Sequence, residues 1–169
     1  MKAIVNDANI LIDLVDLALL PNFFSLKFEF LTTELVLTEL YEDQYGCLLP
    51  YIENKSLAIP ELTEEDLLEI TSIQTTRPNL SEQDCSAFHQ AWKNNAILIT
   101  SDNTLKKFAK EKGLEVHGHL WVFDRMVKAQ TITGARAYQK LEELCNNVNP
   151  KLGLPKSECE KLIKLWSKE

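Results

Sequence analysis

The residues Ala96-Ile97-Leu98-Ile99-Thr100-Ser101-Asp102-Asn103 contain the clearest buried strand of the chain, followed at once by residues that cap a helix. An apolar run without any charge is typical of a strand covered on both faces, as in a parallel sheet. Ser101-Asp102-Asn103 ends the strand, and a helix is predicted over residues 104–112, where Gly113 closes it. This stretch therefore predicts one strand-to-helix unit of an α/β sheet.

The same order of strand and helix recurs through the first two-thirds of the chain. Alternating strands and helices are typical of βαβ units, so we predict an α/β fold with a mostly parallel central sheet. Helices should cover both faces in three layers, with extra helices at the C-terminus. The other strands are predicted at residues 2–6, 29–32, 56–59 and 114–116. The other helices are predicted from residue 10, over 34–44, from residue 64, over 82–93, 120–128 and 134–146, and after Pro155, where Ser157-x-x-Glu160 is a capping box.

Length and composition indicate one globular core. The chain has 169 residues, of which 45% are hydrophobic and 25% charged, and it has only five Gly and six Pro. Asp7, Asp13 and Asp16 interrupt the opening apolar segment, and no run approaches the roughly 20 residues that span a bilayer. We therefore expect a soluble, unsecreted, cytoplasmic protein without a membrane partner.

Cysteine and histidine residues do not form a zinc-binding pattern. His117 and His119 lie beside a predicted strand end, while His89 lies on another helix, so they do not complete a site. The cysteines make no CxxC pair, and buried free thiols in a reducing cytoplasm are the simplest expectation. They are Cys47, Cys85, Cys145 and Cys159.

Charge is unevenly distributed along the chain. The net charge is −7, but residues 1–90 carry four Lys or Arg against sixteen Asp or Glu, whereas residues 91–140 carry nine against four. An acidic pocket that binds metal beside a basic rim that follows phosphates would produce this division. Two ordinary solvated faces would produce it too, so both interpretations stay open.

Four carboxylates stand where strand-to-helix units would bring them to one edge of the sheet. Asp7 and Asp102 follow predicted strands, Asp84 lies in the first turn of a predicted helix, and Glu39 shares a face of the helix over 34–44 with apolar residues. Each Asp alone could be a helix cap or a charge that suits the helix dipole, but Glu39 has no capping role. Jointly they predict a site for divalent cations, which prefer oxygen ligands.

Four segments in sequence order each hold one of these acids. They are Ile4-Val5-Asn6-Asp7-Ala8-Asn9-Ile10-Leu11-Ile12, Leu35-Val36-Leu37-Thr38-Glu39-Leu40, Leu80-Ser81-x-x-Asp84-x-x-Ala87, and Leu98-Ile99-Thr100-Ser101-Asp102 with the helix that follows as far as Gly118. Together they resemble the PIN-domain nuclease family. The resemblance implies a nuclease domain over residues 1–130 and a helical extension over 131–169 packed on it. Residues 118–135 are most similar to a subgroup of small prokaryotic PIN proteins with toxin-like members.

The resemblance also implies roles for individual residues. It assigns catalysis and the binding of Mg²⁺ or Mn²⁺ to Asp7, Glu39, Asp84 and Asp102. Asn9 matches the assisting polar position two residues after the first Asp. Many family members have a further acid just after the last Asp, whereas this chain has Asn103 and Thr104 there and no carboxylate before Glu111. Asn103 is thus an auxiliary polar candidate, and whether one or two metals bind stays open.

The function that the resemblance implies is hydrolysis of RNA phosphodiester bonds by a metal-activated water. The alternative is a weak or inactive PIN-like module that binds RNA or protein. Family members often pair with an antitoxin and form homodimers, so the resemblance implies both as partners. Lys106, Lys107 and Lys110 are candidates for phosphate contacts or simply a solvated helical face. Trp92, Trp121 and Trp166 could stack on bases, although packing in the core or against a partner is the simpler expectation.

Overall fold

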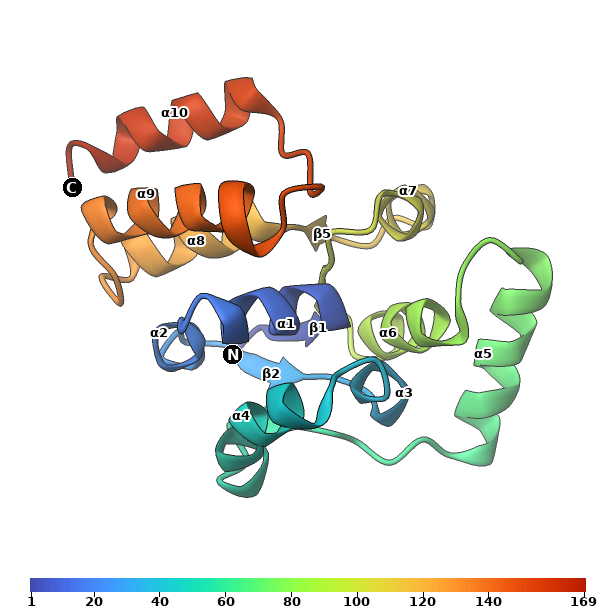
Figure 1. Ribbon diagram of the computed structural model, residues 1–169. Helices are drawn as coiled ribbons and strands as arrows, with labels where there is room; N and C mark the ends of the chain where they lie inside the picture. Colours follow the sequence, from blue (N-terminus) through green and yellow to red (C-terminus); the bar gives the residue numbers. More distant parts are fainter.

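A sheet of five short parallel strands forms the centre of the computed structural model, which describes all of residues 1–169 (Figure 1). The strand order is β3-β2-β1-β4-β5, and every neighbouring pair is parallel. The predicted α/β fold with a parallel sheet is confirmed. The strands are β1 (Ala3–Asn6), β2 (Glu29–Leu31), β3 (Leu57–Ala58), β4 (Ile97–Ile99) and β5 (Val116–His117).

The sheet reverses its order at β1, which lies between β2 and β4. The chain first moves outward through β2 and β3 and then returns to the other side of β1. Val5 pairs with Leu98 and Asn6 with Ile99, so β1 and β4 end side by side. Ligands of α/β proteins bind outside the carboxyl ends of strands at such a reversal. Asp7 and Thr100 directly follow these two strand ends.

Two apolar clusters cover the two faces of the sheet, as the alternating direction of side chains along a strand requires. Ile4, Ile97 and Ile99 belong to one cluster, whereas Val5 and Leu98 belong to the other. The first cluster includes residues of α1 (Ala8–Asp16), α2 (Leu20–Phe24), α4 (Glu42–Glu53), α8 (His119–Lys128), α9 (Gly134–Glu143), the π-helical turn η1 (Leu144–Val148) and α10 (Lys156–Trp166). The second includes residues of α3 (Glu34–Leu37), α5 (Glu64–Thr76), α6 (Glu82–Lys93) and α7 (Asn103–Glu111).

One predicted helix is in fact two. The prediction of a single helix over 34–44 is wrong, because α3 ends at Leu37 and α4 begins at Glu42. The Thr38 hydroxyl donates to the carbonyl of Leu35 at 2.6 Å, which competes with continuation of the helix. The backbone N–H of Tyr41 then donates to the Gln44 side chain at 2.9 Å and starts the new helix. Glu39 therefore lies in an exposed turn and not on an apolar helical face.

The C-terminal segment packs into the same apolar cluster as β1. Ile132, Leu141 and Trp166 are buried together with Ile4. Figure 1 shows α10 lying along α9, on the side of the molecule opposite α5. The division at residue 130 stays a prediction. The expected capping box at Ser157-x-x-Glu160 is wrong, because α10 begins at Lys156 without a side-chain cap.

Two other features bear on the expectations from sequence. No helix combines the length and the apolar composition that crossing a membrane requires. All four cysteines are free. Cys85 is buried, Cys145 and Cys159 are half-buried and Cys47 is exposed, so the expectation of buried thiols is wrong for Cys47.

Candidate active site

Asp7 is the most buried of the four acids. It follows β1, caps the N-terminus of α1 and is only 2% exposed. Its Oδ1 accepts a hydrogen bond from the backbone N–H of Ala8 at 2.9 Å, and its Oδ2 accepts one from the Thr100 hydroxyl at 2.6 Å. Burial raises the pKa of Asp7 to about 6, the Thr100 bond opposes this rise, and the charges of Asp84 and Asp102 add to it. The carboxyl group is thus held where ionisation is costly without a cation.

Thr100 connects two of the acids and was not predicted as a site residue. It directly follows β4 and is fully buried. Its hydroxyl donates to Asp7, and the same oxygen accepts a hydrogen bond from the backbone N–H of Asp102 at 3.1 Å. A buried hydroxyl group needs hydrogen-bond partners of this kind. The sequence contains a signal for this role: Thr100 ends an apolar strand and stands two residues before an acid.

Asp102 and Asp84 each stabilise a helix N-terminus and keep one carboxylate oxygen free. Asp102 caps α7, and its Oδ1 accepts a hydrogen bond from the backbone N–H of Leu105 at 2.7 Å. Asp84 forms a capping box with Ser81 at the start of α6, with both bonds at 3.0 Å. Burial raises the pKa of Asp84, hydrogen bonds from the backbone and side chain of Ser81 oppose this rise, and the charge of Asp102 adds to it. The capping roles considered for these residues are therefore real, and they leave room for a ligand.

Glu39 faces the same cluster from the turn after α3. Partial desolvation of its carboxyl group raises its pKa to about 7, and the charges of Asp7, Asp84 and Asp102 add to the rise. Two contacts attach this region to α6: the hydroxyls of Thr33 and Ser86 lie 2.7 Å apart, and the Gln83 side chain donates to Thr38 at 3.3 Å. Four acids that are far apart in sequence thus act electrostatically on one another.

The auxiliary polar residues differ in their positions. Asn9, in the first turn of α1, and Asn103, the first residue of α7, are both exposed. Asn6, which was not predicted, is fully buried beside Asp7. Its amide donates to the carbonyl of Leu31 at 3.3 Å, while its Oδ1 has no hydrogen-bond partner. Asn6 therefore places an unpaired oxygen acceptor next to the most buried acid.

The three candidate lysines separate into one near the strand ends and two in solvent. The Nζ of Lys106 lies against Gly118, so close that a Cβ added at Gly118 would meet it at 2.7 Å. The same Cβ position is 3.3 Å from the carbonyl of Thr100, which places the Lys106 ammonium at the ends of β4 and β5. Burial lowers the pKa of Lys106, and the charge of Lys110 lowers it further. Lys107 and Lys110 are exposed on α7.

The histidines lie at three separate places and serve structural contacts. The ring of His117 stacks on Trp121 with 4.7 Å between centroids. His119 is buried and lies 2.7 Å from Asp13, and His89 lies 2.7 Å from Asp66. No group of three or more His, Cys, Asp or Glu side chains has the spacing of a formed metal site.

The chemistry of the acid cluster nevertheless suits a hard divalent cation. The donors are carboxylate oxygens, and Asp84, Asp102 and Glu39 each retain oxygens that accept no hydrogen bond from the protein. Burial raises the pKa of Asp7, Asp84 and Glu39, and neighbouring carboxylates raise each further, so a bound cation would favour their ionised forms. Asp7, Asp84, Asp102 and Glu39 are the residues that could hold it.

A protein-family model described as a PIN domain matches residues 3–168, which is nearly the whole chain. A search of curated proteins returned no match.

Proposed function

Because the chain belongs to the PIN-domain family, a nuclease superfamily whose members typically use divalent metals, we propose that it is a metal-dependent endoribonuclease. It would hydrolyse RNA phosphodiester bonds. The observation that carries the proposal is a group of carboxyl groups beyond the strand ends: burial raises the pKa of Asp7 to about 6 and that of Glu39 to about 7, and the charges of Asp84 and Asp102 add to both rises. Perturbed acids gathered at the ligand-binding edge of a sheet are typical of a catalytic site.

We assign distinct roles to the acids. Asp7, Asp84 and Asp102 would hold Mg²⁺ or Mn²⁺, with Thr100 and Ser81 fixing the orientation of their carboxylates. A bound divalent cation supplies Lewis acidity that activates water and stabilises charge on the phosphate. Glu39, the most exposed of the four, would help to hold the cation or orient the attacking water and accept its proton. The water oxygen bonds to phosphorus, the bond to the leaving oxygen breaks, and that oxygen takes a proton from solvent.

Lys106 would bind the phosphate at the edge of this site. Its ammonium lies at the ends of β4 and β5, and burial and the charge of Lys110 lower its pKa, so a phosphate there would stabilise its charged form. Asn9 and Asn103 would supply further polar contacts beside Asp7 and Asp102. Lys107 and Lys110, which are exposed, would contribute long-range attraction for the RNA backbone.

The test is cleavage of a mixed RNA panel by purified protein in Mg²⁺, Mn²⁺ or EDTA. We expect metal-dependent cleavage that falls at least about 100-fold in Asp7→Asn and Asp102→Asn, because each removes a proposed ligand charge. Asp16→Asn, which changes an exposed acid at the other end of α1, is the matched control and should cleave normally. Equal cleavage by all four proteins would identify a contaminating nuclease and end the proposal.

The second candidate function is a PIN-like binding module that cuts slowly or not at all. Asn103 and Thr104 favour it, because they stand where many family members have a further acid. A toxin role with an antitoxin partner, and a homodimer, stay predictions from the sequence. Absence of cleavage together with a melting temperature that no divalent cation raises would favour the binding module.

A further inference from the structure

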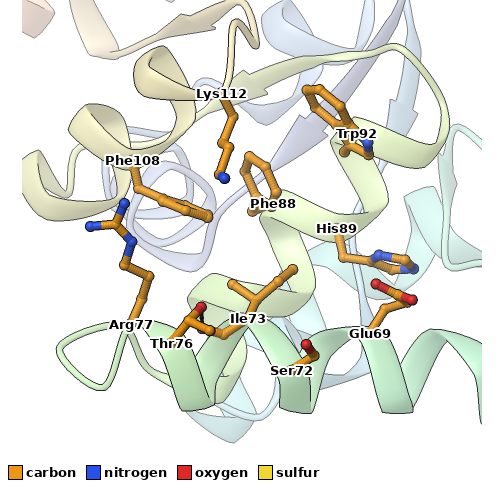
Figure 2. Close-up of a pocket in the computed structure, with 10 residues that line it drawn as sticks. All are labelled: Glu69, Ser72, Ile73, Thr76, Arg77, Phe88, His89, Trp92, Phe108 and Lys112. Atoms are coloured by element: carbon orange, nitrogen blue, oxygen red, sulfur yellow. Dashed lines mark hydrogen bonds between the residues drawn. The ribbon is translucent and has the colours of Figure 1, made fainter.

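A cavity lies between α5, α6 and α7, away from the acid cluster: none of the four acids lines it. Its volume is about 580 Å³, which is within the usual range of small-ligand pockets. Figure 2 shows the rings of Phe88, Trp92 and Phe108 along one wall, with Arg77 and Lys112 beside Phe108. We call this cavity, together with the smaller neighbouring cavity that shares Arg77 and Phe108 with it, the aromatic groove.

The wall of the aromatic groove is a connected series of rings. The centroids of Phe88 and Phe108 are 4.6 Å apart, and those of Phe88 and Trp92 are 6.0 Å apart with only 20° between the planes. Phe88 and Phe108 are buried, whereas Trp92 is 55% exposed. An exposed indole face next to buried rings is a surface on which another flat ring can stack.

Positive groups border these rings. The Arg77 guanidinium lies 5.3 Å from the centroid of the Phe108 ring, and the Lys112 ammonium lies 5.8 Å from it. Arg77 also contacts the exposed carboxylate of Glu111 at 3.2 Å, while the Lys112 side chain is exposed. Arg77 and Lys112 outnumber Glu69, the one acid that lines this cavity, so the stacking surface favours an anion that carries flat rings.

The aromatic groove lies along the two helices that carry Asp84 and Asp102. Phe88 and Trp92 follow Asp84 at intervals of four residues on α6, so the three lie on one face of that helix. At a rise of about 1.5 Å per residue, Trp92 is about 12 Å along the axis from Asp84. A smaller cavity of about 100 Å³ shares Arg77 and Phe108 and adds Thr104 and Lys107, in the first turns of α7. Asp102 caps that same helix.

We propose that the aromatic groove binds single-stranded RNA on one side of the cleavage site. A base stacks on Trp92, and Arg77, Lys107 and Lys112 contact phosphates along the groove. The identity of this strand as substrate rests on the proposed ribonuclease function. Stacking on side chains requires bases that are not already paired, so single strands are the expected ligand.

The test measures binding with cleavage switched off. Wild type and variants are titrated in EDTA with fluorescently labelled single-stranded RNA of about 12 nucleotides, and anisotropy gives the dissociation constant. We expect Trp92→Ala to weaken binding about tenfold and Trp92→Tyr to retain most of it, because tyrosine also stacks. Lys112→Gln should weaken binding and reduce the slope of log K against log salt by about 0.7.

Controls use residues of the same kind on the far side of the molecule. Tyr138→Ala removes an exposed ring on α9, and Lys164→Gln removes an exposed ammonium on α10. Both should bind like wild type. Fully paired RNA should bind wild type and Trp92→Ala equally. Melting temperatures identify any variant that does not fold. If Trp92→Ala fails to fold, the RNA affinity of Lys112→Gln, an exposed substitution, tests the inference in its place.

The outcomes separate this inference from the proposed function. If RNA binds but Trp92→Ala and Lys112→Gln have no effect, the aromatic groove is not the RNA site, whatever the cleavage assay shows. If both variants weaken binding in a protein that never cleaves, the ribonuclease proposal fails and the groove stands as an RNA-binding site. Displacement of the RNA by polyglutamate from wild type and Trp92→Ala alike would indicate an acidic protein partner and overturn the inference.

Discussion

The hydroxyl of Thr100 reaches across 93 residues of sequence to bind the carboxylate of Asp7 at 2.6 Å. Burial raises the pKa of Asp7 and this bond lowers it, and burial has the larger effect. The side chain of Thr100 therefore determines how readily the central acid ionises, although it carries no charge.

Thr100→Val should raise the pKa of Asp7 beyond about 6, because it removes the donor that favours the carboxylate and keeps the shape of the side chain. Since the cation needs the ionised form, the pH at which Mn²⁺ binding is half-complete should move upward, and affinity at pH 7 should fall about tenfold. Calorimetric titration with Mn²⁺ at several pH values measures this. Thr104→Val, an exposed substitution on α7, is the control, and an unchanged pH profile in Thr100→Val would refute the role.

The stability of the metal-free protein should fall as pH rises from about 4 to about 7. Asp7 and Glu39 have raised pKa values in the folded state, so the folded protein holds protons that the unfolded chain has released. For Asp7, a change from 3.8 to about 6 corresponds to about 3 kcal/mol that is present at low pH and lost through this range. Urea unfolding across the pH range measures it.

The Asp7→Asn variant tests whether Asp7 causes this decline in the stability of the metal-free protein with pH. It should flatten the decline between pH 4 and 7 and make the metal-free protein more stable than wild type at pH 7. Mg²⁺ should restore wild-type stability at neutral pH and leave Asp7→Asn nearly unchanged. Parallel curves for the two proteins would show that Asp7 does not titrate in this range.

Ionised Asp66 should stabilise the fold at neutral pH, and this stabilisation should be lost in acid. His89, the N–H of Thr63 and Lys93 bind its carboxylate and hold its pKa well below its usual range. A depressed pKa gives stability that is present above the unfolded value of about 4 and is lost as pH falls below it. Asp66→Asn should therefore destabilise the protein at pH 7 and remove this acid-side loss in urea unfolding. The exposed neighbour Glu65→Gln is the control, and a wild-type profile in Asp66→Asn would contradict the assignment.

The strands, and the positions of Asp7, Asp84 and Asp102 at strand ends and helix starts, could be predicted from sequence because their signals are local. The apolar run 96–100 and the capping pattern from Ser81 to Asp84 are complete within a few residues. The turn at Glu39 could not be predicted, because the hydroxyl of Thr38 and the cap at Tyr41 prevailed over an apolar helical pattern. The role of Thr100 and the aromatic groove both depend on contacts between segments that are distant in sequence. The hydrophobic periodicity of a sequence does not predict such contacts.

Lys106→Gln should lower the cleavage efficiency for RNA about tenfold, because its ammonium lies at the ends of β4 and β5, where the proposed site would bind a phosphate. Lys110→Gln, an exposed neighbour on the same helix, should have a much smaller effect that disappears as salt increases. Values of kcat/KM at two salt concentrations compare the variants. Equal losses in both would assign the effect to general attraction and not to a phosphate contact.

Gly134→Ala should destabilise the fold by about 1–3 kcal/mol, because a Cβ there would overlap the backbone carbonyl of Trp166. Gly46→Ala is the matched control. Gly46 lies within α4 with open space around it, so alanine should stabilise the protein by about 0.5–1 kcal/mol. Thermal unfolding of both variants gives the difference. Equal melting temperatures would mean that α9 and α10 do not pack as closely as described.

The bond between Thr100 and Asp7 also has a consequence during synthesis on the ribosome. A chain that has emerged only as far as α6 has β1, β2 and β3, but it lacks both the strand that pairs with the far edge of β1 and the hydroxyl that orients Asp7. No shortened product that ends before residue 100 can assemble the acid cluster. Under the proposed function, a nascent or truncated chain of this length could not cut RNA, because the acid cluster forms only once β1 has both of its neighbouring strands.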